Sequence, residues 1–142
     1  MTLANVRTAL FSALVAVLLA GCSTTGDKGG GGWLLSDRPS SSTPYITALQ
    51  GGIISRSDVE ISNSDKARAL EAEYRALEAA PGGQSVGWQG SDISGQVIAA
   101  APYQVGSQNC RQYAHTITTG GREVKVRGAA CRNKDGTWTP LI

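Results

Sequence analysis

The residues of this 142-residue chain that could perform chemistry are a single histidine and three cysteines. No serine or aspartate lies at a spacing that selects it as a triad partner for His115, so the sequence does not indicate nucleophilic catalysis. Cys110 and Cys131 lack the C-x-x-C spacing of a zinc site, and the sequence has no second histidine to complete one. We therefore expect a protein that is not an enzyme, holds no metal or cofactor, and uses His115 as a structural residue of a strand.

The third cysteine, Cys22, follows a short apolar segment. Residues 1–21 contain one cation, Arg7, and then a run of apolar and small residues from Ala9 to Ala20. This run has the length of a signal-peptide core and is shorter than the roughly 20 residues that a membrane-spanning helix needs. The box Leu19-Ala20-Gly21-Cys22 resembles the cleavage site of bacterial lipoproteins, in which the cysteine is acylated and begins the mature chain.

This resemblance implies where the protein resides. Several acyl chains on Cys22 would form a stable anchor, which makes the outer membrane the expected partner and location. Ser23, rather than aspartate, follows the cysteine, and under enteric sorting rules this favours the outer membrane, with the head facing the periplasm or the cell surface. The formal net charge of +2 gives no excess of Lys and Arg for binding nucleic acid.

If Cys22 is acylated, two cysteines remain, Cys110 and Cys131. An even number of remaining cysteines in an exported protein predicts a disulfide. If Gly120-Gly121 is the two-residue turn of a hairpin, Thr119 faces Arg122, and the same register sets Cys110 opposite Cys131. The pair then falls at a non-hydrogen-bonded position, where the Cα atoms are about 4.5 Å apart and a disulfide fits. We predict an intramolecular disulfide that stabilises the head by about 3 kcal/mol.

The same register predicts what each face of the hairpin carries. Tyr113, His115 and Ile117 share the more apolar face, which we expect to pack under a helix. The disulfide shares the other face with Lys125 and Arg127, so we expect it to be at least partly accessible to solvent.

One helix is predicted before this hairpin. Ser62 and Asp65 have the spacing of a capping box, and Pro81 cannot continue the helix. We expect the helix to pack on a sheet through the stripe Ala67, Leu70, Tyr74 and Leu77. Strands are predicted at Ser85–Gln89, Gly95–Ala100, Cys110–Thr118, Arg122–Arg132 and Thr137–Leu141. The fold class is therefore α+β, with one helix packed on a small antiparallel sheet.

Residues 22–61 separate the predicted signal peptide, residues 1–21, from the predicted head, residues 62–142. Gly, Ser, Thr and Pro dominate this segment, and its apolar residues form short islands at Trp33-Leu34-Leu35 and Ile53-Ile54. Such a composition buries too little apolar surface to offset the entropy of ordering, which predicts a flexible tether.

Several motifs of the predicted head occur together in one known family. They are Val86-Gly87-Trp88, Asn109-Cys110-Arg111-Gln112-Tyr113 and Arg127–Trp138, after the helical segment Asp65–Pro81. Together with the lipoprotein box, this order of motifs resembles the bacterial 17 kDa surface antigen family of outer-membrane lipoproteins. The resemblance implies a surface-antigen-like envelope lipoprotein and no particular reaction. Of the glycine-rich repeats of many relatives, only Gly51-Gly52-Ile53-Ile54 corresponds here, inside the predicted tether.

Two functions of different classes remain open. The first is a non-enzymatic outer-membrane lipoprotein with an envelope structural or interaction role. Its basic C-terminal residues are candidates for contact with an envelope protein, lipopolysaccharide or peptidoglycan. The simpler interpretation, which we favour, is that they form a solvated polar face of a small exported sheet. The second is an inhibitor or binding module for an envelope lytic enzyme or protease, with the segment Pro102–Asn109 as its inserted loop. For Arg111 and Arg132, an alternative to such contacts is pairing with Asp135 or Glu78.

Overall fold

A computed structural model describes residues 42–141 of the chain. Two α-helices come first, α1 (Thr43–Ala48) and α2 (Asn63–Glu78), with the 3-10 helix η1 (Ile53–Arg56) between them. Six strands follow: β1 (Ser85–Gln89), β2 (Ile93–Ala99), β3 (Tyr103–Val105), β4 (Gln108–Thr119), β5 (Arg122–Arg132) and β6 (Trp138–Leu141). The predicted α+β class is confirmed.

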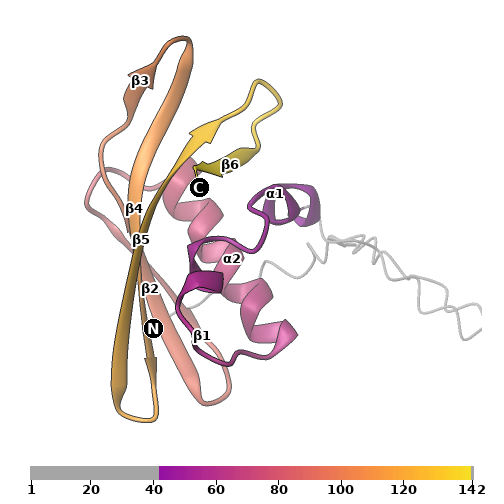
Figure 1. Cartoon of the computed structure of the whole chain (residues 1–142), viewed down its shortest axis with the longest axis vertical. Helices are drawn as coiled ribbons and strands as arrows, with labels where there is room; N and C mark the ends of the chain where they lie inside the picture. Colours follow the sequence, from indigo (N-terminus) through magenta and orange to yellow (C-terminus); the bar gives the residue numbers. More distant parts are fainter. Residues whose placement is uncertain (1–41, 142) are drawn as a thin grey trace, which may run out of the picture. The chain divides into compact units, whose positions relative to one another are not determined.

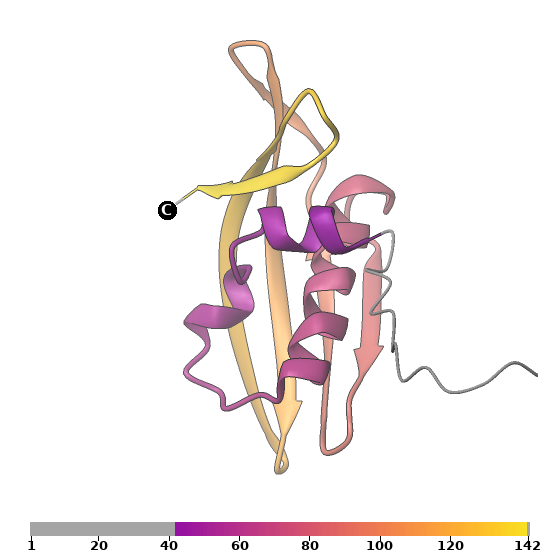
Figure 2. The same ribbon diagram turned by 90° about the vertical axis from the view of Figure 1, so that its right-hand side faces the viewer.

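The strands form one antiparallel sheet in the order β1-β2-β4-β5-β6, with β3 paired to the beginning of β4. The helices all lie on one side of this sheet (Figures 1 and 2). The other side, which carries Gln96, Thr116 and Lys125 in one cross-strand row, is called the open face here, because no helix of the described part of the chain crosses it. No described helix has the length and apolar character needed to span a membrane.

The ends of α2 follow from its sequence as predicted. The Ser62 hydroxyl accepts a hydrogen bond from the Asp65 backbone amide at 3.1 Å and caps the first turn. Asp65 also binds the Arg68 guanidinium at 2.6 Å. Pro81 follows the C-terminal end at Glu78, where a proline stops further helical turns.

The face of α2 that packs on the sheet differs from the predicted stripe. Ala67 is exposed, whereas Leu70 and Tyr74 are half-buried on the side near α1, where the rings of Tyr45 and Tyr74 lie 5.0 Å apart. Of the predicted stripe, only Leu77 belongs to the buried face. The other buried residues of α2 are the small residues Ala69, Ala72 and Ala76 and the two acidic residues Asp65 and Glu73. This face suits the sheet beneath it, because bulky side chains such as Trp88 and Tyr113 fill the space that the alanines leave.

The second half of the predicted tether is part of the folded unit. Residues 42–61, called the N-terminal strap here, contain α1 and η1, and Leu49, Ile53 and Ile54 are buried in the core. The composition of the strap did not indicate this packing, because few of its residues are apolar. Three apolar residues are nevertheless enough, since they pack against the same core of α2 and the sheet. The remaining part of the predicted tether and the predicted signal peptide lie outside the described residues.

The predicted strands and their register agree closely with the structure. β1 and β5 have the predicted bounds, and the observed pairing sets Thr119 opposite Arg122 and Cys110 opposite Cys131. The segment Pro102–Asn109 was wrongly expected to be irregular. It contains β3, which folds back on β4 through Gly106-Ser107, so that β3 and β4 form a further hairpin at the end of the sheet (Figure 1).

Candidate functional site

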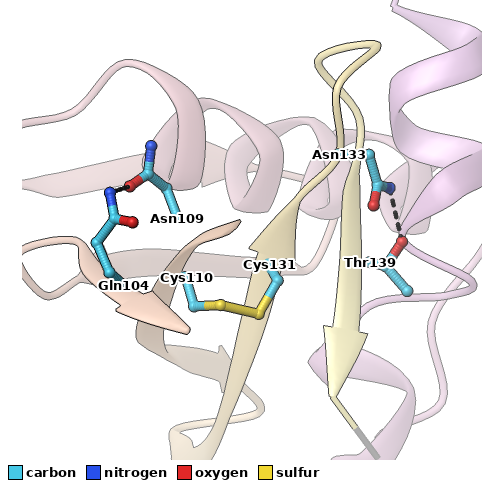
Figure 3. Close-up of a disulfide and its surroundings, with 6 residues drawn as sticks. All are labelled: Gln104, Asn109, Cys110, Cys131, Asn133 and Thr139. Carbon is cyan, nitrogen blue, oxygen red and sulfur yellow. Dashed lines mark hydrogen bonds between the residues drawn. A yellow bond between two sulfur atoms is a disulfide. The ribbon is translucent and has the colours of Figure 1, made fainter. Parts of the chain in front are cut away.

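The structure joins Cys110 and Cys131 in a disulfide with a Cα–Cα distance of 4.0 Å (Figure 3). The predicted solvent access is wrong, because Cys110 is 0% and Cys131 5% exposed. Both cysteines do lie on the open face, but Tyr103 of β3 and Thr139 of β6 stand opposite them in the same cross-strand row. Neighbouring strands therefore flank the disulfide on both sides, and the sequence had indicated no strand at β3.

The disulfide lies near one end of the sheet, between the hairpin of β3 and β4 and the hairpin of β5 and β6. On one side, the Gln104 amide donates a 2.8 Å hydrogen bond to the Asn109 side chain, next to Cys110. On the other side, the Asn133 amide donates to the Thr139 hydroxyl at 2.8 Å (Figure 3). Side-chain hydrogen bonds thus hold each hairpin, and the disulfide links the two.

Cys22, the predicted lipidation site, lies outside the described residues. Its acylation therefore remains a prediction from the sequence. Within residues 42–141, no cluster of histidine, cysteine, aspartate and glutamate side chains is suited to hold a metal ion.

Glu73 connects three elements of the core, and nothing in the sequence analysis indicated it. Its side chain is completely buried, and its two carboxylate oxygens accept hydrogen bonds from the backbone amides of Ile53 and Ile54, each at 3.1 Å. The Nδ1 atom of His115 lies 2.8 Å from Glu73 Oε1, and the Tyr113 hydroxyl lies 3.4 Å from Oε2. The carboxylate thus joins the N-terminal strap, α2 and β4.

His115 is fully buried and both of its ring nitrogens are engaged. The Trp88 indole N–H donates to His115 Nε2 at 2.7 Å, so Nε2 must act as an acceptor. The ring hydrogen is therefore on Nδ1, which donates it to Glu73. The arrangement resembles the histidine–carboxylate pair of a hydrolase, but the indole occupies the nitrogen that a nucleophile would need.

Tyr113 completes the buried network as a hydrogen-bond donor. Burial, followed by the nearby negative charge of Glu73, raises the pKa of Tyr113 far above its ordinary value of 10.0. The phenol is therefore protonated at neutral pH and can donate to the carboxylate.

Gly52 permits the close approach of the strap to Glu73. Its φ of 63° lies in the left-handed region, and a Cβ at this position would overlap the Glu73 carboxylate and the Leu70 side chain. The sequence signal that could have revealed the site is a glutamate at the centre of the alanine spacing Ala69, Ala72 and Ala76, where a solvated residue is not expected.

Arg132 pairs with Glu78, which confirms one of the expected alternatives. Two guanidinium nitrogens of Arg132 lie 2.9 Å from the two carboxylate oxygens, and the Trp138 indole donates to the same carboxylate at 2.8 Å. The hydrogen bond from Arg132 lowers the pKa of Glu78 below its ordinary value of 4.5, against the opposing effect of burial. This pair connects the end of α2 to β5 and β6.

Arg111 binds no carboxylate among the described residues, which corrects the expectation that it pairs with Asp135 or Glu78. Its guanidinium donates to the carbonyls of Leu77 and Ala80, each at 2.9 Å, and to that of Ala76 at 3.1 Å. The carbonyls of Ala76 and Leu77 are among those that the end of a helix leaves without partners, and the helix dipole favours a cation there. Ala80 lies just beyond the C-cap Ala79. Burial lowers the pKa of Arg111, so these contacts hold a cation that is largely removed from water.

Comparison with known proteins bears on the C-terminal half of the chain. Residues 75–139 match the family described as 17 kDa outer membrane surface antigen. The 17 kDa surface antigen of Rickettsia bellii is 40% identical over 81 residues, which cover 55% of this chain and 51% of the relative. The protein of the same name from Rickettsia felis is 38% identical over the same shares, and that from Rickettsia prowazekii is 40% identical over 75 residues.

The predicted resemblance to the surface antigen family is therefore confirmed for this half of the chain. The chain spans about half the length of the curated relatives it matches. No solved structure matches it.

Proposed function

We propose that this chain is a non-enzymatic outer-membrane lipoprotein that presents a surface-antigen-like head, with a structural or interaction role in the cell envelope. The observation that carries this proposal is the similarity of residues 75–139 to outer membrane surface antigens. The closed network around His115 supports it further. The candidate catalytic histidine has no ring nitrogen available, and its side chain is 0% exposed.

The lipid anchor is tested by labelling cells with radioactive palmitate. Cys22→Ser should abolish incorporation of the label and leave an uncleaved or mislocalised precursor, because the thiol is the acyl acceptor. The matched control is the double variant Cys110→Ala and Cys131→Ala, which removes the other two cysteines and should retain the label. Normal labelling of Cys22→Ser would contradict the proposal.

The non-enzymatic assignment is tested by His115→Gln. This variant should leave the cellular role unchanged apart from a loss of stability, because His115 is fully buried and its ring nitrogens bond to the buried side chains of Trp88 and Glu73. Hydrolysis of purified peptidoglycan by the wild-type protein, lost in a His115→Gln protein that is still folded by circular dichroism, would overturn the assignment.

The hairpin of β3 and β4 supports an alternative function, as an inhibitor or binding module for an envelope lytic enzyme or protease. Tyr103 and Val105 on this hairpin are 39% and 53% exposed, as residues that insert into a partner would be. If this role is correct, adding the protein should slow peptidoglycan hydrolysis by a lytic enzyme, and Val105→Asp should relieve the effect. Ala67→Asp, at an exposed position of α2 on the helical side, is the control for added charge.

A further inference from the structure

Four large apolar side chains on the surface of the described residues all belong to one face of the sheet. Ile98, Tyr103, Val105 and Leu141 are between 37% and 53% exposed. Residues directly opposite each other in paired strands project from the same face. Ile98 is opposite Ala114, and Tyr103 is opposite Cys110. Both partners lie an even number of residues from Thr116 along β4, so they share the open face with it.

The other two follow the same register. Val105 is opposite Gln108, again an even-numbered position of β4, and Leu141 is opposite Ala129, which itself faces Gln112. The open face therefore carries all four exposed large apolar side chains. No described helix covers them, because the helices lie on the opposite face (Figures 1 and 2).

The open face is also hollowed next to Ile98, and Ala129, which is opposite Leu141, lines the same hollow. Small residues, Ala100, Ala114 and Ala129, line a depression of about 610 Å³ with Ile98 and Gln112 on its walls. Exposed apolar surface that is contiguous and concave marks a contact site more often than scattered apolar residues do.

The charges on the open face identify the chemistry of the partner. Arg127 lines the depression opposite Ala114, and Lys125 lies in the next row, opposite Thr116. The rows that contain the four apolar side chains hold no aspartate or glutamate. The acidic residues closest to them are Glu123, in the row beyond Lys125, and Asp135, in the turn between β5 and β6. Apolar and aromatic side chains beside cations suit the interface of an anionic bilayer. A second copy fits less well, because two such faces would bring like charges together.

We propose that the open face docks on an anionic lipid surface, with Ile98, Tyr103, Val105 and Leu141 entering the interface and with Lys125 and Arg127 against the headgroups. This inference rests on the envelope location in the proposed function. It adds a second, non-covalent contact with the membrane to the one at Cys22. Because an anchored head stays close to the lipid, even a weak affinity of this face would suffice for docking.

The test uses residues 37–142 without any acyl group, since this part forms one compact unit that contains the whole core. It is sedimented with vesicles of phosphatidylglycerol and phosphatidylcholine, and with vesicles of phosphatidylcholine alone. Binding is expected only to the anionic vesicles and should weaken as salt is added. Ile98→Glu and Arg127→Glu should each reduce binding at least fivefold, about the effect of one cation near a charged membrane.

Two control variants add the same charges on the helical side. Ala67→Glu matches Ile98→Glu, and Arg75→Glu matches Arg127→Glu, at exposed positions of α2. Both controls should bind as the wild-type protein does. Circular dichroism establishes that every variant is folded.

The orientation is tested with a tryptophan at Tyr103. Trp88 and Trp138 are buried, so Tyr103→Trp should supply most of the fluorescence that brominated lipids quench. Ala67→Trp, on the helical side, should not be quenched. Equal binding of Ile98→Glu and wild type, or equal quenching at the two positions, would overturn the proposal. So would self-association that Ile98→Glu abolishes, which would assign the face to a second copy.

The outcome is separable from that of the proposed function. Failure of vesicle binding would leave acylation at Cys22 intact, because the tested polypeptide lacks that residue. Failure of palmitate labelling would likewise leave the vesicle result unaffected.

Discussion

Glu73 carries its charge inside the core, where hydrogen-bond donors rather than an ion pair with a basic side chain surround it. Two backbone amides, an imidazole N–H and a phenol point to the two oxygens. Such a site is stable only while every donor keeps its acceptor. A buried donor without an acceptor lowers the free energy of unfolding by at least as much as its hydrogen bond contributed.

Replacing Glu73 with Gln should therefore destabilise the protein strongly. The new amide presents N–H groups to donors that need an acceptor, and we expect a loss of about 3 kcal/mol in the free energy of unfolding. Urea denaturation measures this loss. Glu71→Gln, at an exposed position of the same helix, is the control and should change the free energy by less than about 0.5 kcal/mol. Similar losses in the two variants would contradict the role of Glu73.

Glu78 should make part of the stability depend on pH. Its pKa in the folded protein is lowered by Arg132, so its contribution is complete above 4.5 and is lost as the pH falls through the folded value. Arg132 is 39% exposed, so solvent screening limits the contribution to about 1 kcal/mol.

The difference in unfolding free energy between wild type and Glu78→Gln, measured by urea denaturation, should therefore shrink between neutral and acidic pH. A difference that grows or stays constant over this range would show that the ion pair contributes no pH-dependent stability. Glu123→Gln, at an exposed position of β5, is the control for removing a surface carboxylate and should change the free energy of unfolding at neutral pH by less than about 0.5 kcal/mol.

At the scale of elements, the contact between η1 and β5 depends on the absence of a side chain. A Cβ on Gly128 would lie 2.5 Å from a methyl group of Ile53, which is fully buried. The strap can therefore lie directly on the sheet only where β5 has a glycine.

Gly128→Ala should cost about 1–3 kcal/mol through this overlap. Combining it with Ile53→Ala should cost less than the sum of the two single variants, because the smaller residue makes room for the methyl group. Thermal denaturation of the four proteins provides the double-mutant cycle. Gly87→Ala is the control and should be nearly neutral, because a Cβ there would meet only the Gly95 carbonyl oxygen, at 3.9 Å. Strict additivity would mean that the two residues do not interact.

The sequence predicts the features that depend on residues close together in the chain, and misses those that depend on residues far apart in it. The hairpin register and the ends of α2 follow from local chemistry, namely Gly120-Gly121, Ser62 and Pro81, and both were predicted. The packing of the strap depends on Glu73 and Gly128, which lie 19 or more residues from Ile53 and Ile54. Neither residue has a pattern in its own neighbourhood that indicates a buried partner, so composition alone suggested a tether.

Burial of the disulfide was missed for a related reason. The alternation of β4 and β5 correctly assigned Cys110 and Cys131 to the face opposite the helix. Accessibility, however, also depends on whether strands extend the sheet on either side. β3 is only three residues long and gives too weak a periodic signal to be predicted.

At the scale of the whole molecule, the disulfide should set both stability and resistance to reduction. Opening this loop of about 20 residues should lower stability by about 3 kcal/mol, which corresponds to roughly 12–24 °C in melting temperature. Because both cysteines are buried, dithiothreitol should reduce the native protein far more slowly than the urea-unfolded protein.

Calorimetry and thiol titration of residues 37–142 measure these effects. The variant carrying both Cys110→Ala and Cys131→Ala should have the same melting temperature with and without reductant. Two free thiols in protein isolated from the periplasm, or a dimer linked through Cys110, would refute the pairing.

The hydrogen bonds from the strap to Glu73 have a consequence for hydrogen–deuterium exchange. The amide hydrogens of Ile53 and Ile54 belong to a short 3-10 helix near the start of the folded unit, where rapid exchange through local fraying is the usual behaviour. Here the acceptor is a buried carboxylate that is itself bound to β4, so releasing these amides means exposing the centre of the core. Their protection factors should therefore equal those of the central strand, and these two peptide hydrogens report global unfolding of the molecule.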